Sequence, residues 1–530
     1  MRRGCSLVAA SKGGRRGRLK PIGGDVPALT TRAASRLAPG SGGGHRDTFR
    51  ILSPAASQPM ATFPSRLLLA LVLPALLGAA EQKHRVDSPA ALREALRRAV
   101  PGDRIQLKDG VHQLDATLSI RSGGTADRPL VIEAETLHGA ELTGSHGIAI
   151  GESAEHVVIR GLRLTHAAGR FTVAAGARHI RITRNQFRCP GDGVMLSISG
   201  DDVEVDHNEF AEKTTTGAML ALAGAGQQVA RRAWIHHNLF RDFAAPLGSN
   251  SEMLRVGLSV TGLSVGRALV EHNLFLRARG ETRLISNRSS GNVYRHNTFA
   301  ESPTAQVDLR HGNEVEFYGN FLRGTEGLRL FGDRHRVHGN YFESNYAGIS
   351  LGNGTVESAG PGAPAAAMDR PDDCAIVFNT FVDNRTHLQL ARAAGERLGA
   401  RNITVAHNVF QGGTTVARID GPYAGAVWQG NFLGPRVSPG QMPPEGYTRG
   451  NLQLQAAADG LQRPAPSSPL LDAGSRDFPF VQVDLDGQPR GDRPDAGADE
   501  VSTAPASARP LRPEDVGPGA RTAAATGSTP

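Results

Sequence analysis

The chain of 530 residues is poor in cysteine, in aromatic residues and, beyond Ala80, in lysine. Three cysteines cannot supply a disulfide framework for a chain of this length. Aromatic residues make up 5% of the sequence whereas glycine occurs 64 times, which favours a turn-rich β protein over a helical bundle. Beyond Ala80 the lysines are Lys83, Lys108 and Lys213, so arginine carries most of the positive charge there.

The chain up to Ala80 forms two segments that we expect to precede the folded protein. Residues 1–59 are rich in Arg, Gly, Ser and Ala without apolar periodicity, and we interpret them as a spurious or non-native leader rather than a basic arm. Residues 60–80 combine Arg66, an apolar run too short to span a bilayer and a small-residue exit, a pattern typical of a signal peptide. We therefore expect a secreted or periplasmic protein with no membrane segment in its mature form.

The formal net charge of +8 comes mostly from these two segments. Residues 1–59 hold eleven Arg and Lys against two acidic residues, and Arg66 adds one more positive charge. Without them the net charge is about −2, so the basic balance gives no support for nucleic-acid binding, and we expect no nucleic-acid partner.

A unit of two β residues, two further residues, Asn, one residue and Phe recurs along the chain at a nearly regular spacing. One such unit cannot bury its apolar face alone, whereas stacked units form a continuous core. We predict an all-β fold, a single-stranded right-handed parallel β-helix in which the asparagines stack as a ladder at one turn and the Phe side chains stack inside. The asparagines are Asn185, Asn208, Asn238, Asn273, Asn297, Asn320, Asn340, Asn379, Asn408 and Asn431.

The N-terminal end of the predicted solenoid has a cap. In DSPAALREALRRAV, Asp87 or Ser88 suits the cap of a short helix, Pro89 suits its first turn, and Leu92 and Leu96 share one face. Such a helix covers the open edge of the first coil.

The predicted β-helix domain spans residues 81–502. SSPLLDAG and VDLDGQPRGDRPDAGADE look like the closing segment of many β-helix proteins, and residues 503–530, rich in Pro, Ala and Gly, are predicted to be a disordered tail. Cys189 and Cys374 lie about seven rungs apart, on the order of 34 Å, so we expect no disulfide between them.

The segment GETRLISNRSSGNVYRHNTFAESPTAQVDLRHGN, residues 280–313, holds the candidate site. Between residues 277 and 336 there are ten arginines against seven acidic residues, directly after an insertion at 241–262 that interrupts the repeat. Arginine's planar fork suits carboxylate and sulfate groups, and stacked rungs form a groove suited to a polymer. The pattern predicts an acidic polysaccharide as substrate; the alternative is a solvated face of salt bridges.

Residues 85–500 resemble polysaccharide lyase family 6, which includes chondroitinase B and many alginate lyases. The matching motifs are GETRLISNRSSGNVYRHNTF, VDLRHGNEVEFYGNFL and GLRLFGDRHRVHGNYF. The resemblance implies cleavage of uronate polymers by β-elimination, in which the C5 carboxylate is neutralised, a base takes the C5 proton and an acid protonates the leaving O4. In that family a calcium ion held by one Asn and two Glu does the first task, a Lys is the base and an Arg is the acid.

Carried over to this sequence, the family's first Glu ligand falls on Glu281 and its acid on Arg310. Its Asn ligand falls near Ser249 or Asn250. Arg329 and His335 match a motif that lines the family's groove, and we add His311, beside Arg310, to the expected substrate-binding residues.

Two positions depart from the family. Its second Glu ligand falls on Arg283, which removes a calcium ligand and adds a cation, so we expect no metal or other cofactor and expect Arg283 to pair with Glu281 and face the substrate carboxylate. Its Lys base falls on Arg288, which is a poor base at its ordinary pKa.

Three roles stay open for Arg288. It is partly deprotonated beside Arg283 and Arg310, or it clamps the substrate while His311 or Tyr294 takes the proton, or the site binds without cutting. Lys213 stays open as a base from elsewhere in the groove.

We therefore expect a secreted, calcium-independent lyase acting on alginate, with Arg288 and Arg310 as catalytic residues. The alternatives are a weakly catalytic or non-catalytic carbohydrate-binding β-helix protein and a lyase of dermatan or chondroitin sulfate.

Overall fold

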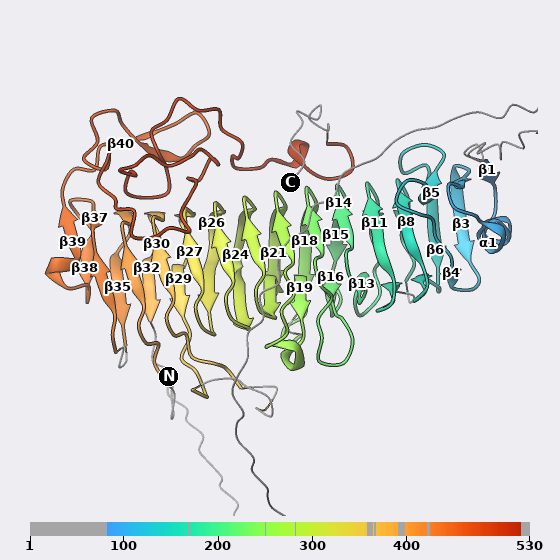
Figure 1. Ribbon diagram of the computed structural model, residues 1–530, viewed down its shortest axis with the longest axis horizontal. Helices are drawn as coiled ribbons and strands as arrows, with labels where there is room; N and C mark the ends of the chain where they lie inside the picture. The colour runs from blue at the N-terminus through green and yellow to red at the C-terminus, as the bar shows by residue number, and fades with distance from the viewer. Residues whose placement is uncertain are drawn as a thin grey trace, which may run out of the picture. The chain divides into compact units, whose positions relative to one another are not determined.

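The computed structural model describes residues 82–520 except 168–169, 250, 281, 358–363, 365–366, 391–397 and 421–423. The leader, the signal segment, Asn250 and Glu281 therefore lie outside the described residues. The described chain winds into a parallel β-helix whose coils stack along one axis (Figure 1). This confirms the predicted right-handed parallel β-helix. None of the described helices is both long and apolar enough to cross a membrane.

Each coil contributes strands to three columns, and neighbouring coils pair in parallel. The first column contains β1 (Lys83–Val86), β2 (Arg104–Leu107), β5 (Leu130–Ala134), β8 (Glu155–Arg160), β11 (Arg178–Thr183), β14 (Glu204–Asp206), β17 (Trp234–His236), β20 (Leu269–Glu271), β23 (Val293–Arg295), β25 (Glu316–Tyr318), β27 (Arg336–His338), β30 (Ala375–Val377), β33 (Thr404–Ala406) and β36 (Val427–Gln429).

The second column follows the first in each coil. It contains β3 (Gly110–Leu114), β6 (Ala140–Gly144), β9 (Arg163–Leu164), β12 (Gln186–Phe187), β15 (Glu209–Lys213), β18 (Leu239–Ala245), β21 (Leu274–Gly280), β28 (Tyr341–Glu343), β31 (Thr380–Val382), β34 (Val409–Gln411), β37 (Asn431–Leu433) and β39 (Tyr447–Arg449).

The third column carries the candidate site. It contains β4 (Leu118–Ile120), β7 (Ile148–Ile150), β10 (Phe171–Val173), β13 (Leu196–Ile198), β16 (Ala218–Leu222), β19 (Ser251–Gly257), β22 (Thr282–Arg288), β29 (Ala347–Leu351), β32 (Thr386–Leu390), β35 (Thr415–Ile419) and β38 (Ser438–Gly440). Two long strands, β24 (Thr298–His311) and β26 (Phe321–Leu330), run through both the second and third columns.

The ten repeat asparagines form an unbroken ladder at the turn between the first and second columns. All ten are fully buried, and the side-chain amide of each of the first nine donates to the side-chain oxygen of the next at 2.9–3.1 Å. This confirms their predicted role in holding turns. The Phe residues two positions later stack inside the helix, with ring centroids 4.4–4.9 Å apart from Phe187 to Phe299.

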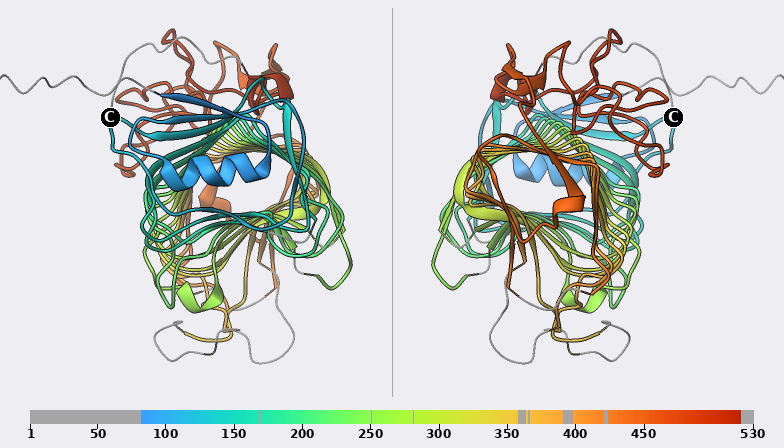
Figure 2. Two further views of the ribbon diagram at one scale, coloured as in Figure 1. Left: turned by 90° about the vertical axis from the view of Figure 1, so that its right-hand side faces the viewer. Right: turned by 90° about the vertical axis from the view of Figure 1, so that its left-hand side faces the viewer.

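The predicted N-terminal cap is present as α1 (Pro89–Arg98). The Ser88 side chain accepts a hydrogen bond from the Ala91 N–H, and Leu92 and Leu96 are buried against the first coils. Figure 2 shows α1 lying across the open end of the helix.

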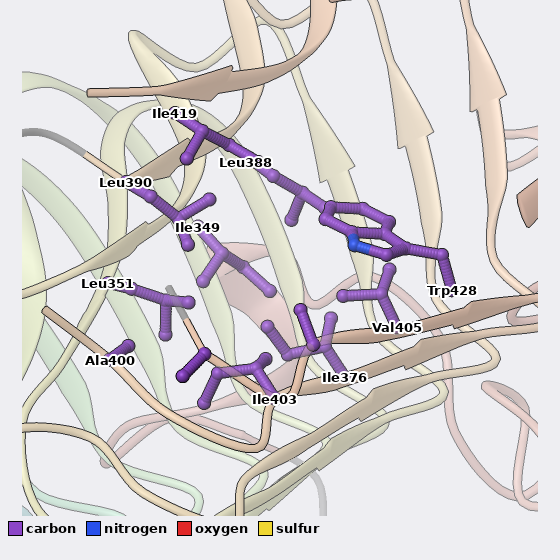
Figure 3. A pocket seen from close by; sticks show the side chains of 12 residues that line it. Ile349, Leu351, Ile376, Leu388, Leu390, Ala400, Ile403, Val405, Ile419 and Trp428 are labelled. Atoms are coloured by element: carbon purple, nitrogen blue, oxygen red, sulfur yellow. The ribbon is translucent and has the colours of Figure 1, made fainter. Parts of the chain in front are cut away.

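The last coils enclose a small cavity. Aliphatic side chains and Trp428 line this apolar space of about 20 Å³ inside the helix (Figure 3). This cavity is too small to hold a sugar, and its lining offers no set of polar groups that could bind a ligand. We therefore interpret it as a packing defect of the core.

The segment after the last coil runs back along the outside of the helix instead of closing its end. It holds β40 (Leu454–Ala456), antiparallel to β41 (Gln462–Pro464), and packs Leu485 and Ala498 on Phe321 and Tyr341 of the second column. The remaining short helical turns are η1 (Ser259–Thr261), η2 (Pro444–Gly446) and η3 (Pro513–Asp515).

Residues 503–520 are placed on the helix, where composition predicted disorder. Val516 packs with Leu239, Leu274 and Leu276, and the Leu511 N–H donates to the Thr298 hydroxyl at 2.8 Å. Leucine side chains of the second column thus hold residues 503–520 in place, although the composition of this segment predicted disorder. Residues 521–530 lie outside the described part of the chain.

Both described cysteines are free. Cys189 and Cys374 are buried in separate parts of the core, which confirms that they are not bonded to each other.

Candidate active site

The outer face of the third column brings charged residues of consecutive coils side by side. In-register pairing of β19, β22, β24 and β26 places Arg255, Ser286, Asp308 and Arg329 in one row. The apolar residues that alternate with them, such as Val307, face the core. The alternation of a half-buried strand therefore turns one polar residue per coil outward.

Asp308 lies at the centre of the row and is fully buried. Arg329 donates from Nε to Oδ1 at 3.0 Å and from Nη2 to Oδ2 at 2.6 Å, and Arg283 donates from Nε to Oδ2 at 3.1 Å. Burial alone would raise the pKa of this carboxyl, but Arg329, Arg283 and Arg310 hold it below its usual range. Asp308 is therefore a carboxylate that joins arginines of the two neighbouring coils.

Glu252 is the second buried carboxylate, with 1% of its surface exposed. Arg288 donates from Nη2 to its Oε1 at 2.9 Å and from Nε to the Ser286 hydroxyl at 3.2 Å. Arg255 Nη1 lies 3.9 Å from Oε2, which has no hydrogen-bond partner in the described part of the chain. Burial raises the pKa of Glu252 against the opposing effect of the arginines around it.

Arg288 combines burial with a cationic neighbourhood. Burial lowers the pKa of its guanidinium, Glu252 opposes that shift, and Arg310 and Arg255 add to it. The direction is the one that a proton acceptor requires. Thr261 of the inserted segment holds the end of β22, since its hydroxyl donates to the Arg288 carbonyl at 3.1 Å.

Arg310 stands out because its side chain has no hydrogen-bond or ion-pair partner within the described residues, and its Nε is buried. Burial lowers the pKa of this guanidinium; Asp308 opposes the shift, and Arg283 and Arg329 reinforce it. A guanidinium with a lowered pKa gives up a proton more readily than an ordinary one.

His311 ends β24 beside Arg288, after an irregularity in the strand pairing. Its Nε2 is buried without a hydrogen-bond partner among the residues that the structure describes, and burial, Arg288 and Arg310 lower its pKa to about 4. The imidazole is therefore neutral at neutral pH. The η1 turn packs against it, because a Cβ placed on Gly262 would lie 3.4 Å from the His311 Cβ.

Three residues considered from the sequence lie away from this cluster. His335 is fully buried; Nδ1 accepts from the Val315 N–H and Nε2 donates to the Phe331 carbonyl, so it holds a turn instead of lining the groove. Tyr294 is fully buried in the core and donates to the Asn287 side-chain oxygen at 2.8 Å. Its burial also raises the pKa of the phenol, which excludes it as an accessible base.

Lys213 is also removed from the cluster. Its buried ammonium group donates to the Gly191 carbonyl and the Thr215 hydroxyl, both at 2.9 Å. The described part of the chain therefore offers no lysine at the site.

The sequence did not single out Glu252, Arg255 and Asp308 as site residues. Asp308 carried a usable signal, because it stands two residues before Arg310 in VDLR and so faces the same way in a strand. Glu252 carried none: its partner Arg288 is 36 residues away and reaches back along the strand over Ser286. Arg283, expected to pair with Glu281, pairs with Asp308 among the described residues.

Two positions expected to carry calcium ligands, Asn250 and Glu281, lie outside the described residues, and arginines already pair with the described carboxylates of the site. Calcium requires six to eight oxygen ligands, whereas the two described carboxylates, Glu252 and Asp308, already bind guanidinium groups. Within the described ranges, the groups spaced to share a metal are Glu204–Asp206–His236 on the first column and Asp484–Asp486–Asp499 in the C-terminal segment.

Comparison with known proteins identifies the family. The family model for chondroitinase B matches residues 86–410, more than half of the chain. No curated protein sequence matches.

Several solved structures share the fold. An alginate lyase of polysaccharide lyase family 6, AlyGC, superposes with a TM-score of 0.63 at 24% identity, over 73% of this chain and 55% of that one. A mannuronic acid-specific family 6 lyase from human gut microbiota gives 0.58 at 23%, over 70% and 91%. A family 6 lyase from Pseudopedobacter saltans gives 0.56 at 18%, over 82% and 99%.

The present chain spans about half the length of the first of these structures, 55%. At such identities the structures show the shared β-helix, and the family model carries the assignment. The chain belongs to the chondroitinase B family, polysaccharide lyase family 6.

Proposed function

We propose that the protein is a polysaccharide lyase that cleaves alginate, a uronate polymer, by β-elimination without calcium. The observation that carries the proposal is the arginine cluster on the third column, where five arginines, at positions 255, 283, 288, 310 and 329, surround two buried carboxylates. Family membership supports the reaction type. Alginate is supported by two solved relatives of the same fold, described as an alginate lyase and a mannuronic acid-specific lyase.

In this proposal Arg283 neutralises the substrate carboxylate. It uses only Nε to reach Asp308, so its two terminal amino groups have no partner among the described residues. A guanidinium binds a carboxylate with two parallel hydrogen bonds and needs no metal ion to do so. That pairing makes the C5 proton more acidic, the task that the resemblance to the family assigns to a calcium ion.

Proton transfer is assigned to Arg288 and Arg310. Arg288, in its deprotonated form, takes the C5 proton; the C5–H electrons form the C4–C5 double bond as the C4–O4 bond breaks, and Arg310 gives a proton to O4. The lowered pKa values of both guanidinium groups favour these roles.

A second candidate function is binding of acidic polysaccharide without cleavage. The observation that favours it is the ion pair between Arg288 and Glu252 at 2.9 Å, which stabilises the charged guanidinium and so opposes its use as a base.

One experiment separates these functions. The protein beginning at residue 81 is incubated with alginate, dermatan sulfate or chondroitin sulfate, with and without EDTA, and the ultraviolet absorbance of the unsaturated product is followed. We expect absorbance to rise with alginate equally in both conditions. No rise with any polymer, together with retained binding, would support the second candidate. Loss of the signal in EDTA would refute calcium independence, and a rise limited to dermatan or chondroitin sulfate would move the substrate to a sulfated polymer.

We also propose export from the cytoplasm, on the signal pattern of residues 60–80. N-terminal sequencing of the protein recovered from the periplasm or medium should begin at residue 81. Recovery only from the cytoplasm, with the earlier residues retained, would contradict it.

A further inference from the structure

We propose that Asp308 is a positioning residue of the lyase reaction, which orients Arg283 and Arg329 and so leaves Arg310 without a partner within the described part of the chain. The inference rests on the proposed function, since it assigns the orientation of the same cationic site to one buried side chain.

The geometry places Asp308 on the middle of three consecutive coils. Its register partners are Ser286 on the coil before and Arg329 on the coil after. Arg329 lies directly beside Asp308. Arg283 lies three residues before Ser286 on the preceding strand, and its guanidinium group extends to Asp308. One carboxylate thus binds guanidinium groups from both neighbouring coils, with three N–H donors on its two oxygens.

The rest of the row shows that an acidic residue at this place is a local feature. The register continues from Arg329 through Ser350 and Gln389 to Arg418, and it extends back from Ser286 to Arg255. Within these described positions Asp308 is the one acidic residue. The other coils hold their strands with neutral or basic residues, so the fold itself does not require a carboxylate here.

The orientation follows from which nitrogens bind. Arg283 and Arg329 both donate Nε to Asp308, so the edge of each guanidinium is fixed, and Arg283 keeps its terminal amino groups for another acceptor. Without the carboxylate the two positive groups would repel one another and separate. One of them, or Arg310 itself, would lose its defined position in the site.

A matched carboxylate lies on another column of the helix. Asp206 on the first column is also buried and binds Arg181, at 2.8 Å from Nε to Oδ1, together with His207 and Thr183. It reproduces the burial and the ion pair of Asp308 outside the proposed site. Substitutions of Asp206 therefore measure how much stability the protein loses when a buried carboxylate is removed.

The test is a double-mutant cycle of Asp308→Asn and Arg329→Gln, with Asp206→Asn and Arg181→Gln as the control cycle. Turnover of alginate and thermal unfolding are measured for all variants. We expect Asp308→Asn to lower kcat by about 100-fold with little change in KM, because it misplaces groups that act on developing charge. In the Arg329→Gln background it should cost far less, since the two residues act as a unit. The control cycle should lower the unfolding temperature and leave kcat unchanged.

The outcomes are distinct. If wild-type protein cleaves alginate and Asp308→Asn keeps its kcat, or its effect multiplies independently with Arg329→Gln, the positioning role is refuted. If the single variant Asp308→Asn does not fold, the double variant is compared with the single variant Arg329→Gln, because the double variant removes both charges together. Equal turnover of these two proteins supports the positioning role, and lower turnover of the double variant refutes it.

If wild-type protein cleaves no uronate polymer, the proposed function fails, and the same cycle is read from the Kd for alginate oligosaccharides. Coupling between the two sites in Kd then supports positioning for binding, whereas independent effects, or an absence of binding in wild-type protein, refute it.

Discussion

The asparagine ladder and the arginine cluster occupy different turns and columns of the same coils, and they treat buried polar groups in opposite ways. In the ladder, Asn297 donates to Asn320 and to two backbone carbonyls and accepts from Asn273, so its amide is fully used. In the cluster, four buried atoms have no hydrogen-bond partner among the described residues: Glu252 Oε2, Arg255 Nε, Arg310 Nε and His311 Nε2.

This difference separates stability from function within one repeat. The hydrogen-bonded, neutral ladder holds the turn at little cost in free energy, whereas buried atoms without a partner are destabilising, and the cluster holds four of those in the described residues. The same contrast appears in charge, because the ladder is neutral and the cluster collects five arginines around two carboxylates.

The largest effect should come from the unpaired arginine of the cluster. Arg310→Gln is expected to lower kcat on alginate by about 1,000-fold, because it removes the proposed proton donor to O4. Thermal unfolding should change little, since the guanidinium has no described partner to lose. Arg336→Gln, at an exposed arginine paired with Glu316 on the first column, is the control and should keep kcat. Equal kcat values for the two variants would contradict the assignment.

The ladder should respond in stability instead of activity. Asn297→Ala leaves buried backbone and side-chain groups of its neighbours unpaired, and we expect it to lower the free energy of unfolding by about 3 kcal/mol. Chemical denaturation measures the change. Asn451→Ala, at an exposed asparagine outside the ladder, should be near neutral. Equal losses in the two variants would show that the ladder adds no special stability.

A smaller effect, of opposite sign, is expected at the base position. Arg288→Lys should raise kcat by about 10-fold, because a lysine deprotonates far more readily than an arginine. The pH dependence of kcat is the decisive measurement, and its rising limb, which the pKa of the base sets, should move to lower pH. Unchanged kcat and an unchanged profile would place the base elsewhere, with His311 the next residue to substitute.

The smallest effect concerns acid sensitivity beside the ladder. Burial, together with His272 and Arg295, lowers the pKa of His296 to about 3, below the ordinary value near 6.5. The unfolded chain therefore binds this proton more readily, and the stability tied to His296 falls as the pH drops from about 6.5 towards 3.

His296→Gly tests that sign. The residue has a φ of 53°, and Gly319 and Gly339 fill the same place in later coils with φ of 61° and 58°, so glycine suits the backbone there. The variant should lose fewer degrees of Tm between pH 7 and pH 5 than wild-type protein. His179→Gly, at an exposed histidine with the same φ, should lose as much as wild-type protein; an equal loss in His296→Gly would contradict the prediction.

Much of the ladder was predictable because its signal is local and repeated. Each Asn is followed two residues later by Phe in most units, and stacking requires only that the units have similar register. The cap residues Ser88, Leu92 and Leu96 were predictable because the signal of a capped amphipathic helix is also local.

The sequence predicted that arginines gather at this site, but it did not predict which ion pairs they form. His335 followed the family motif, but a motif does not give the direction of a side chain, and this ring turned inward to the backbone. For residues 503–520 composition predicted disorder, whereas the structure places them on the helix. Val516 packs on an apolar row of the second column, which composition does not reveal.

The sequence by itself determined the β-helix, the ladder and the gathering of arginines on one stretch of coils, because a repeat of similar length forces equivalent residues into register. Only the tertiary structure decided that Asp308 joins Arg283 to Arg329, that Glu252 holds Arg288, and that Arg310 has no partner among the described residues. Those choices depend on side chains that run along or across strands between coils far apart in the sequence, where separation along the chain carries no information about direction.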